Sequence, residues 1–577
     1  MANSNRIKRT LQIVGLIVFA IFIFAYSYYT FTRHSDMLVF NIFMTVLLVA
    51  LLVLFIVRFK FSDHTRPLFS FLDSKKGEII SVSIVIGVAL IMRAILLTEI
   101  PSGLMGDESA MIYEAWCIGH YGTDRYGNSL PVYLVSWGSG QNALLTYLTI
   151  PFVMLFGMNA FSARIVIYIA INASMIAFYV LVRKLAYRRL AFISLLLFAF
   201  LPYTFMMSRF GLESFLLPVM LIFGLLFLVK ALKDNPWWFV LSAFFFGLSL
   251  YAYAIDFIFL PVFLVGVYIV LLVKKKIHLQ SFIVGNIVLF ALALPLILFV
   301  FVNYFGVEPF NFLGIFAIPK LSAMRDGAAG LHIFENIKNL YKLLVYQDDD
   351  LLWNTISPFG YILPISFPFA IIGLIKIILD LRYRENRTTT NLIIIVYLIA
   401  GLMTALLTTT NSLNHIDYIV PIYILMIGIG IDCFIANKRT CAIVLATIYG
   451  IALILFYSYY FSNAYKDKTA EFFGGEINEA IERAESMRGE DTIIVTDIGY
   501  INILVEIELT PEEFSSTIVW RDPNEGLRVP ITFSHYRYDL DYQGEDVIYL
   551  LSNKTEFNLD NSFEKIVMTD YTIYYKA

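Results

Sequence analysis

Two adjacent carboxylates, Asp107 and Glu108, are the residues of this sequence that most clearly suggest chemistry. They follow an apolar stretch at 78–97 and precede a helix-compatible segment that carries Tyr113. A carboxylate with an ordinary pKa is ionised at neutral pH and can take a proton from a hydroxyl group. The pair is therefore a candidate for abstracting a proton from a hydroxyl group. The alternative is that Asp107 only caps a helix that begins near Ser109.

Several cations and acids in other polar segments are further candidates for binding a substrate. Arg209 lies in a short turn between two apolar stretches, where its guanidinium could hold a phosphate or pair with Glu213. Arg125 and Arg164 are weaker candidates of the same kind. The acidic run Asp348–Asp350 could meet a substrate, could join the first pair of acids around a divalent cation, or could be a solvated loop. Three charged residues of another polar segment, Glu308, Lys320 and Arg325, could likewise meet an acceptor or a sugar, with a solvated loop as the alternative. Asp256 is expected to cap the end of an apolar stretch rather than to bind a ligand. His120 and His332 are lone histidines without the convergent ligands of a metal site.

The composition indicates what kind of scaffold must position these residues. Of 577 residues, 59% are hydrophobic and only 15% are charged, which is typical of a polytopic membrane protein rather than of soluble domains. The net charge of −3 argues against a nucleic-acid partner. Thirteen apolar stretches are long enough to cross a bilayer: 11–30, 37–57, 78–97, 162–182, 190–207, 214–231, 238–254, 256–273, 281–301, 358–377, 391–410, 418–436 and 441–460.

Lys and Arg residues gather in alternate loops between these stretches, and this asymmetry predicts the orientation. By the positive-inside rule the N-terminus is cytoplasmic and residues 465–577 are extracytoplasmic. The count requires that 141–157 is not a span, so we interpret it as a helix along the outer surface, with a half-span as the alternative. Two long outer loops are then expected at about 98–161 and 302–357.

The acidic segment 465–577 is predicted to be a small soluble α/β domain. Its GGEINEAIERAESM has helical periodicity, and TIIVTD, SSTIVW, DVIYLL and EKIVMTDYTIYY have the pattern of strands. It contains no phosphate loop, metal motif or catalytic grouping, so the expectation is a packing or acceptor-docking cap.

Taken together, the motifs resemble those of the GT-C membrane glycosyltransferases, especially the protein O-mannosyltransferase and lipid A aminoarabinose transferase group (bacterial family 39-type). The resemblance covers roughly 78–460 and makes residues 1–77, with the first two spans, an addition to the usual core. The segment NSLNHIDYIVPIY (411–423) is similar to a late outer loop of the family, but His415 stands where relatives usually have Arg. The other residues that carry the resemblance are Gly106, Asp107, Glu108, Asp124, Arg125, Asn128, Pro131, Gly138, Gln141, Phe156, Gly157, Arg164, Ser208, Arg209 and Glu213.

This resemblance implies an enzyme that moves a sugar, hexosyl or pentosyl, from a polyprenyl-phosphate carrier to an acceptor at the outer membrane face, with inversion. The acceptor would be a cell-envelope glycan, a lipid or a protein. The resemblance makes Asp107 the general base, with Glu108 orienting it or the acceptor. It requires no cofactor, and a divalent cation beside the phosphate is neither required nor excluded. The substrate-binding residues would be Arg209, Glu213, Arg125, Arg164, Tyr113, Gln141 and His415. The alternative function is a transporter or flippase of polar or lipid-linked solutes, which would place ionisable residues near mid-membrane and show internal repeats.

Overall fold

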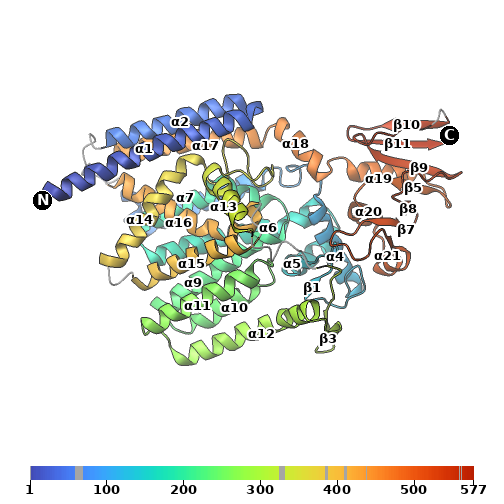
Figure 1. Cartoon of the computed structure of the whole chain (residues 1–577), viewed down its shortest axis with the longest axis horizontal. Helices are drawn as coiled ribbons and strands as arrows, with labels where there is room; N and C mark the ends of the chain where they lie inside the picture. Colours follow the sequence, from blue (N-terminus) through green and yellow to red (C-terminus); the bar gives the residue numbers. More distant parts are fainter. Residues whose placement is uncertain are drawn as a thin grey trace.

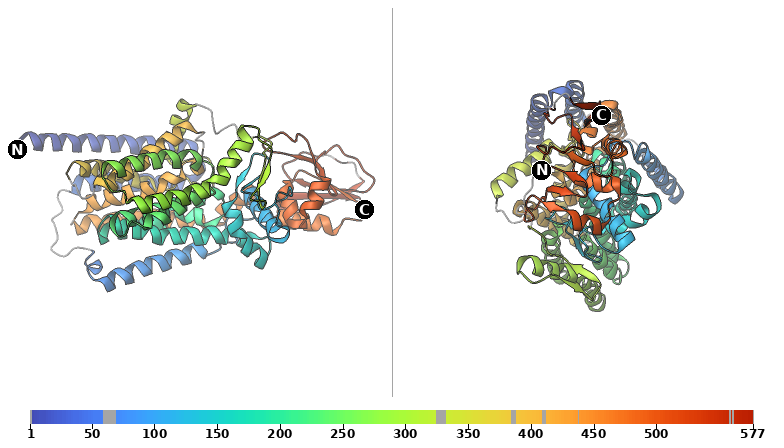
Figure 2. Two further views of the ribbon diagram at one scale, coloured as in Figure 1. Left: turned by 90° about the horizontal axis from the view of Figure 1, so that it is seen from below. Right: turned by 90° about the vertical axis from the view of Figure 1, so that its right-hand side faces the viewer.

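The computed structural model describes residues 2–58, 69–323, 332–383, 388–408, 412–436, 438–557, 559 and 562–576. Arg325 and Asn411, which belong to segments discussed above, lie outside these residues. A bundle of long helices forms one end of the molecule and a sheet domain forms the other (Figure 1). The N-terminus is at the end of the bundle that is remote from the sheet, so the two termini lie at opposite ends (Figure 2).

Within the described residues, eleven helices are long and apolar enough to cross a membrane. This confirms a multi-pass helical membrane protein. The most deeply buried of the eleven in the described structure is α16 (Val420–Ile435). The eleven helices are α1 (Ala2–Arg33), α2 (Leu38–Val57), α3 (Lys75–Ala94), α6 (Ala160–Leu185), α9 (Leu216–Lys233), α11 (Asp256–Val273), α12 (Leu279–Tyr304), α14 (Phe367–Tyr383), α15 (Thr388–Leu407), α16 (Val420–Ile435) and α17 (Arg439–Tyr460).

Two of the thirteen predicted crossings differ from simple spans in the described structure. The stretch 190–207 forms α7 (Arg188–Phe200) and a second helical piece, Pro202–Arg209, bent by 54° at Leu201, and counting this pair as one span gives twelve. The stretch 238–254 forms α10 (Trp238–Ser249), which has only 12 residues. The carbonyl groups of Leu250 and Tyr251, just beyond its end, accept hydrogen bonds from Asn142 Nδ2 (3.1 Å) and Leu144 N (3.1 Å).

The first outer loop folds against the end of the bundle and contains two helices. One is α4 (Gly106–Tyr121), in which Glu108 rather than Asp107 reaches back to the free N–H of Met105, at 3.2 Å. The other is α5 (Leu144–Phe156), whose 13 residues span about 20 Å at 1.5 Å per residue, less than the hydrocarbon thickness. This length agrees with the expectation that 141–157 is not a full span. Between them lie two short paired strands, β1 (Tyr133–Leu134) and β2 (Gln141–Asn142).

The second outer loop contains few regular elements in its described part. They are β3 (Phe310–Phe312), β4 (Phe316–Ile318), α13 (Ile333–Tyr341) and a π-helical turn at 342–346. The loop then enters the irregular segment 347–363, which packs against the outer end of α1.

The C-terminal α/β domain is present as predicted. It begins with α18 (Asn463–Phe473) and α19 (Ile477–Ser486), and continues with α20 (Tyr500–Ile507) and α21 (Pro511–Thr517). In the described residues seven strands form one sheet in the order β10-β11-β9-β5-β8-β7-β6, with β5 parallel to β8 and β9 and the other pairs antiparallel. The strands are β5 (Ile493–Thr496), β6 (Val519–Trp520), β7 (Pro530–Phe533), β8 (Tyr536–Arg537), β9 (Val547–Ser552), β10 (Phe563–Val567) and β11 (Tyr571–Lys576).

Candidate functional site

A polar cavity of about 160 Å³ lies where the helical bundle meets the outer loops. It collects residues that are far apart in the chain, from the start of α4, the β1–β2 connection and three turns between spans. Its lining residues are Asp107, Trp137, Gln141, Leu212, Glu213, Ser214, Tyr253, Asn414 and His415. A second cavity, of about 250 Å³ between α7, α16 and α17, is lined almost entirely by apolar side chains, so it offers no group that could act on a substrate.

Asp107 lies in the first turn of α4 and contributes its carboxylate to the polar cavity. Its Oδ1 accepts a hydrogen bond from the indole Nε1 of Trp137 at 3.2 Å, and the side chain is half-buried. The Trp137 ring also lies within 3.6 Å of the place where a side chain on Gly106 would begin. The carboxylate is therefore held in one orientation while it remains accessible from the cavity.

Glu108 lies on another face of the same turn and is completely buried. It forms an ion pair with Arg164, in which Nε and Nη2 donate to its two oxygens at 3.0 and 3.2 Å. The amide of Gly211 donates to the same carboxylate at 2.8 Å. Because all of these partners are protein groups, Glu108 fixes the start of α4 and so the position of Asp107.

Arg164 is likewise buried and connects α6 to the segment before α4. Besides Glu108 it donates to the carbonyl oxygens of Leu97 (2.9 Å), Pro101 (3.0 Å) and Gly103 (2.6 Å). These bonds satisfy the backbone of a non-helical segment that would otherwise have unpaired carbonyl groups at the membrane boundary.

Arg209, for which the sequence suggested a role in phosphate binding, is not among the residues that line the cavity. Its guanidinium is buried and donates to the carbonyl oxygens of Arg93 (2.7 Å), Leu96 (2.8 Å) and Ile100 (3.2 Å). Its Nε donates to the Tyr460 hydroxyl at 3.0 Å. None of these bonds goes to Glu213, which lines the cavity and accepts from Asn142 N at 2.6 Å. Arg209 thus holds the outer end of α3, where the helix gives way to irregular backbone.

Arg125 and Tyr113 lie on the side of α4 that faces the C-terminal domain. Arg125 is buried in an ion pair with Glu114, with Nε to Oε1 at 2.6 Å, and it also donates to the Tyr500 hydroxyl at 3.3 Å. The Tyr113 hydroxyl donates to the Leu509 carbonyl oxygen. Burial raises the pKa of the neighbouring Asp124 to about 7, with a further contribution from the Glu114 charge. These groups bind the first outer loop to the soluble domain.

The C-terminal domain also supports the Trp137 segment that covers Asp107. Arg528 N donates to the Trp137 carbonyl oxygen at 3.0 Å, and the Tyr500 ring meets the Trp137 ring edge to face at 5.5 Å. From α20, Asn502 Nδ2 donates to Ser109 Oγ at 3.2 Å. The soluble domain therefore contacts both the helix and the loop that carry the cavity's central residues.

Four of the nine predicted site residues come together in the cavity, namely Asp107, Gln141, Glu213 and His415. Sequence reasoning did not select Trp137, Tyr253 or Asn414, although each lies within a segment that it had singled out. Among the described residues no group of three or more His, Cys, Asp or Glu side chains is arranged to hold a metal ion. Asp348 and Asp349 are buried rather than solvated, and Asp350 is exposed.

Comparison with solved structures identifies the class of fold. The crystal structure of ArnT from Cupriavidus metallidurans in the apo state superimposes with a TM-score of 0.54 over 85% of this chain and 97% of that chain, at 13% identity. The structure of the same protein bound to undecaprenyl phosphate gives 0.53 over 87% and 98%, also at 13% identity. The chain therefore shares the fold of ArnT over most of its length, which agrees with the fold that the resemblance in the sequence implies.

A narrower likeness comes from the sequence itself. The family model described as dolichyl-phosphate-mannose-protein mannosyltransferase matches residues 143–302, from α5 through most of α12. A search among curated proteins gives no match. Nothing in these comparisons favours the transporter alternative.

Proposed function

We propose that this protein transfers a sugar from a polyprenyl-phosphate carrier to an acceptor hydroxyl at the outer face of the membrane, with Asp107 as the general base. The observation that carries the proposal is the carboxylate of Asp107, which is held by Trp137 and opens into a polar cavity at the outer end of the bundle. The fold shared with ArnT, which has been crystallised with undecaprenyl phosphate, supports the class of donor.

The reaction follows from these groups. Asp107 takes the proton of the acceptor hydroxyl as that oxygen bonds to the anomeric carbon, while the bond from this carbon to the phosphate oxygen breaks. A single displacement of this kind inverts the anomeric configuration. The leaving phosphate is already an anion, so it needs its charge stabilised rather than a proton.

Of the described residues that line the cavity, His415 is the only one with a basic side chain. We assign it to the phosphate in its protonated form, in the role that the sequence had suggested for Arg209. Asn414 Oδ1 is buried and accepts no hydrogen bond from described residues, so it can accept one from a substrate hydroxyl. Glu213 and Gln141 complete the polar wall that would meet the sugar.

The reaction requires the cavity to face outward. The N-terminus and the basic connections such as Lys274–Lys276 lie at the end of the bundle away from the C-terminal domain (Figure 1). By the positive-inside rule this end is cytoplasmic, and the soluble domain with the cavity is extracytoplasmic.

The test is an Asp107→Asn variant in membranes, assayed with a panel of radiolabelled polyprenyl-phosphate sugars. Loss of a general base typically costs about 10²–10⁴-fold in rate, and we expect a loss in this range. Glu308→Gln, at an exposed acid of the second outer loop, is the matched control and should transfer at the parent rate. Full activity of Asp107→Asn would remove Asp107 as the base. Envelope glycans, lipids and proteins of a deletion strain, compared with its parent, would then identify the acceptor.

A further inference from the structure

The turn that presents Asn414 and His415 to the cavity is short and follows α15. It comprises a single 3₁₀ turn, Leu413–His415, preceded by Ser412 in an extended conformation. Such a turn has few internal hydrogen bonds, so its place relative to Asp107 depends on contacts from elsewhere in the chain.

Asp349, from the second outer loop, supplies the contact that fixes this turn from outside. Its Oδ2 accepts a hydrogen bond from the backbone N–H of Leu413 at 3.0 Å, and the side chain of Asn354 donates to the same oxygen at 2.8 Å. Its Oδ1 accepts from Leu351 N and Thr355 Oγ1 at 3.0 and 3.1 Å. Asp349 is only 6% exposed, and all four donors belong to the protein.

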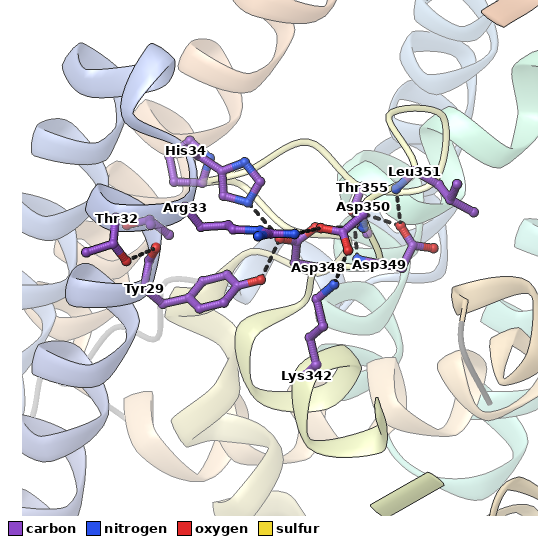
Figure 3. Close-up of polar contacts among 12 residues, drawn as sticks. Tyr29, Thr32, Arg33, His34, Lys342, Asp348, Asp349, Asp350, Leu351 and Thr355 are labelled. Carbon is purple, nitrogen blue, oxygen red and sulfur yellow. Dashed lines mark hydrogen bonds and ion pairs between the residues drawn. The ribbon is translucent and has the colours of Figure 1, made fainter. Parts of the chain in front are cut away.

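The outer end of α1 contacts the second outer loop at Asp348, the residue before Asp349 (Figure 3). Asp348 Oδ2 lies 2.8 Å from the Tyr29 hydroxyl and 2.7 Å from His34 Nε2, and its Oδ1 accepts from Asp350 N at 3.0 Å. The Tyr29 ring stacks on Tyr346 at 4.2 Å with an interplanar angle of 2°. The backbone at Asp350 has φ of +62°, a left-handed conformation that such surrounding contacts must maintain.

We propose that Asp349 is a positioning residue of the cavity, which sets the place of Asn414 and His415 through its bond to Leu413, and that the end of α1 holds Asp349 in register. The N-terminal helical hairpin, which the sequence resemblance treats as an addition to the core, thereby becomes part of the support of the site. This inference rests on the proposed function for its kinetic test, but its structural part can be measured without any activity.

The first experiment compares Asp349→Asn with Asp350→Asn in the full-length protein. Among the described residues, the exposed side chain of Asp350 forms ion pairs with Arg33 (3.7 Å) and Lys342 (2.5 Å), so its variant is the matched control. Small misplacement of a substrate-binding group can cost about 10²-fold in rate, and we expect Asp349→Asn to lower kcat/KM by about 10- to 100-fold while Asp350→Asn stays at the parent value. The double variant Tyr29→Phe with His34→Gln should also lower kcat/KM, but by a smaller factor. Parent-level activity of Asp349→Asn would overturn the inference.

A double-mutant cycle separates positioning from a general loss of folding. If Asp349 acts through the turn, Asp349→Asn should cost markedly less in a His415→Gln background than in the parent chain. Full additivity of the two losses would place its effect elsewhere and refute the proposal.

Hydrogen exchange gives the readout that is independent of catalysis. Backbone amides of residues 412–416 should exchange faster in Asp349→Asn than in the parent or in Asp350→Asn, since the acceptor of the Leu413 N–H is weakened. Unchanged exchange there would contradict the proposed contact. If the parent protein transferred no sugar from any donor but exchange changed as expected, the proposed function would fail while the positioning contact would stand.

Discussion

Asp107 and Glu108 are neighbours in sequence, yet their carboxylates have opposite surroundings. Successive residues of a helix point about 100° apart, so one side chain faces the cavity while the other enters the protein. Glu108 meets Arg164 and the Gly211 amide, whereas Asp107 meets Trp137 and the cavity. The pair is thus divided into one carboxylate that faces the cavity, which the proposed function makes the base, and one that anchors the start of α4.

This division predicts different outcomes for the two conservative amide variants. Glu108→Gln leaves the Arg164 charge buried without its partner, a change that typically costs about 3–5 kcal/mol, so both the thermal unfolding midpoint and the activity should fall. Asp107→Asn should lower activity with little change in the unfolding midpoint. Differential scanning fluorimetry in detergent measures this, with Glu99→Gln at an exposed position as control. A Glu108→Gln protein as stable as the parent would contradict the anchoring role.

Individual residues also show how much of a site can be predicted from sequence. An acidic pair after a span is visible in the sequence, and so is His415 within a family-like segment. The partners of Arg209 are not visible in the sequence. They are the carbonyl oxygens of Arg93, Leu96 and Ile100, which become available only where the chain leaves the helical conformation, at Leu96 with φ of +52°. Spacing predicts an arginine at a boundary but not the backbone that it will satisfy.

The helices and strands also show features that cannot be predicted from the local sequence. Hydrophobic length predicted the long helices well, but it overestimated α10, which ends at Ser249. The carbonyl groups of Leu250 and Tyr251, just beyond this end, accept hydrogen bonds from Asn142 and Leu144. These hydrogen bonds come from a distant part of the chain, so the sequence around α10 gives no sign of them. Three of the four segments predicted as strands in the C-terminal domain correspond to β5, β9 and β10–β11, but SSTIVW is a strand only at β6, because its first residues belong to α21. The strands β7 and β8 and the order of the mixed sheet were not predicted.

Within the soluble domain, one acid joins α19 to β8 and gives a pH-dependent prediction. Burial alone would raise the pKa of Glu485, but hydrogen bonds from His535, Tyr536 and Arg488 outweigh it and lower the pKa to about 2. The ionised carboxylate therefore stabilises the folded domain above about pH 4.5, and this stabilisation is lost as the pH falls from there toward 2.

Hydrogen exchange of peptides from α19 and β7–β8, measured in the full-length protein between pH 6 and 3 and corrected for the intrinsic rate, should show protection falling with pH. In Glu485→Gln protection should be lower at pH 6 and nearly independent of pH. Glu479→Gln, on an exposed face of the same helix, should behave as the parent. Equal pH dependence in all three proteins would rule out Glu485 as its source.

For the whole molecule, the soluble domain and the bundle meet around the candidate site rather than beside it. Asn502 and Tyr500 of α20 contact Ser109 and Trp137, on either side of Asp107. The domain was recognisable from the sequence as a separate acidic α/β unit, but its contacts with the first outer loop were not, because they join residues nearly 400 positions apart. A role in shaping the cavity therefore follows from tertiary structure alone.

This arrangement requires one orientation in the membrane, which labelling can test. A cysteine at Glu512, exposed on α21, should react with a membrane-impermeant maleimide in intact cells, and a cysteine at Lys275, exposed between α11 and α12, should react only after permeabilisation. The parent chain gives the background, since Cys117 and Cys441 are buried and Cys433 is partly so. The expected pattern follows from the basic residues at the end of the bundle remote from the sheet domain. Labelling of Lys275→Cys in intact cells with protection of Glu512→Cys would invert the topology, and a cavity facing the cytoplasm could not serve transfer at the outer face.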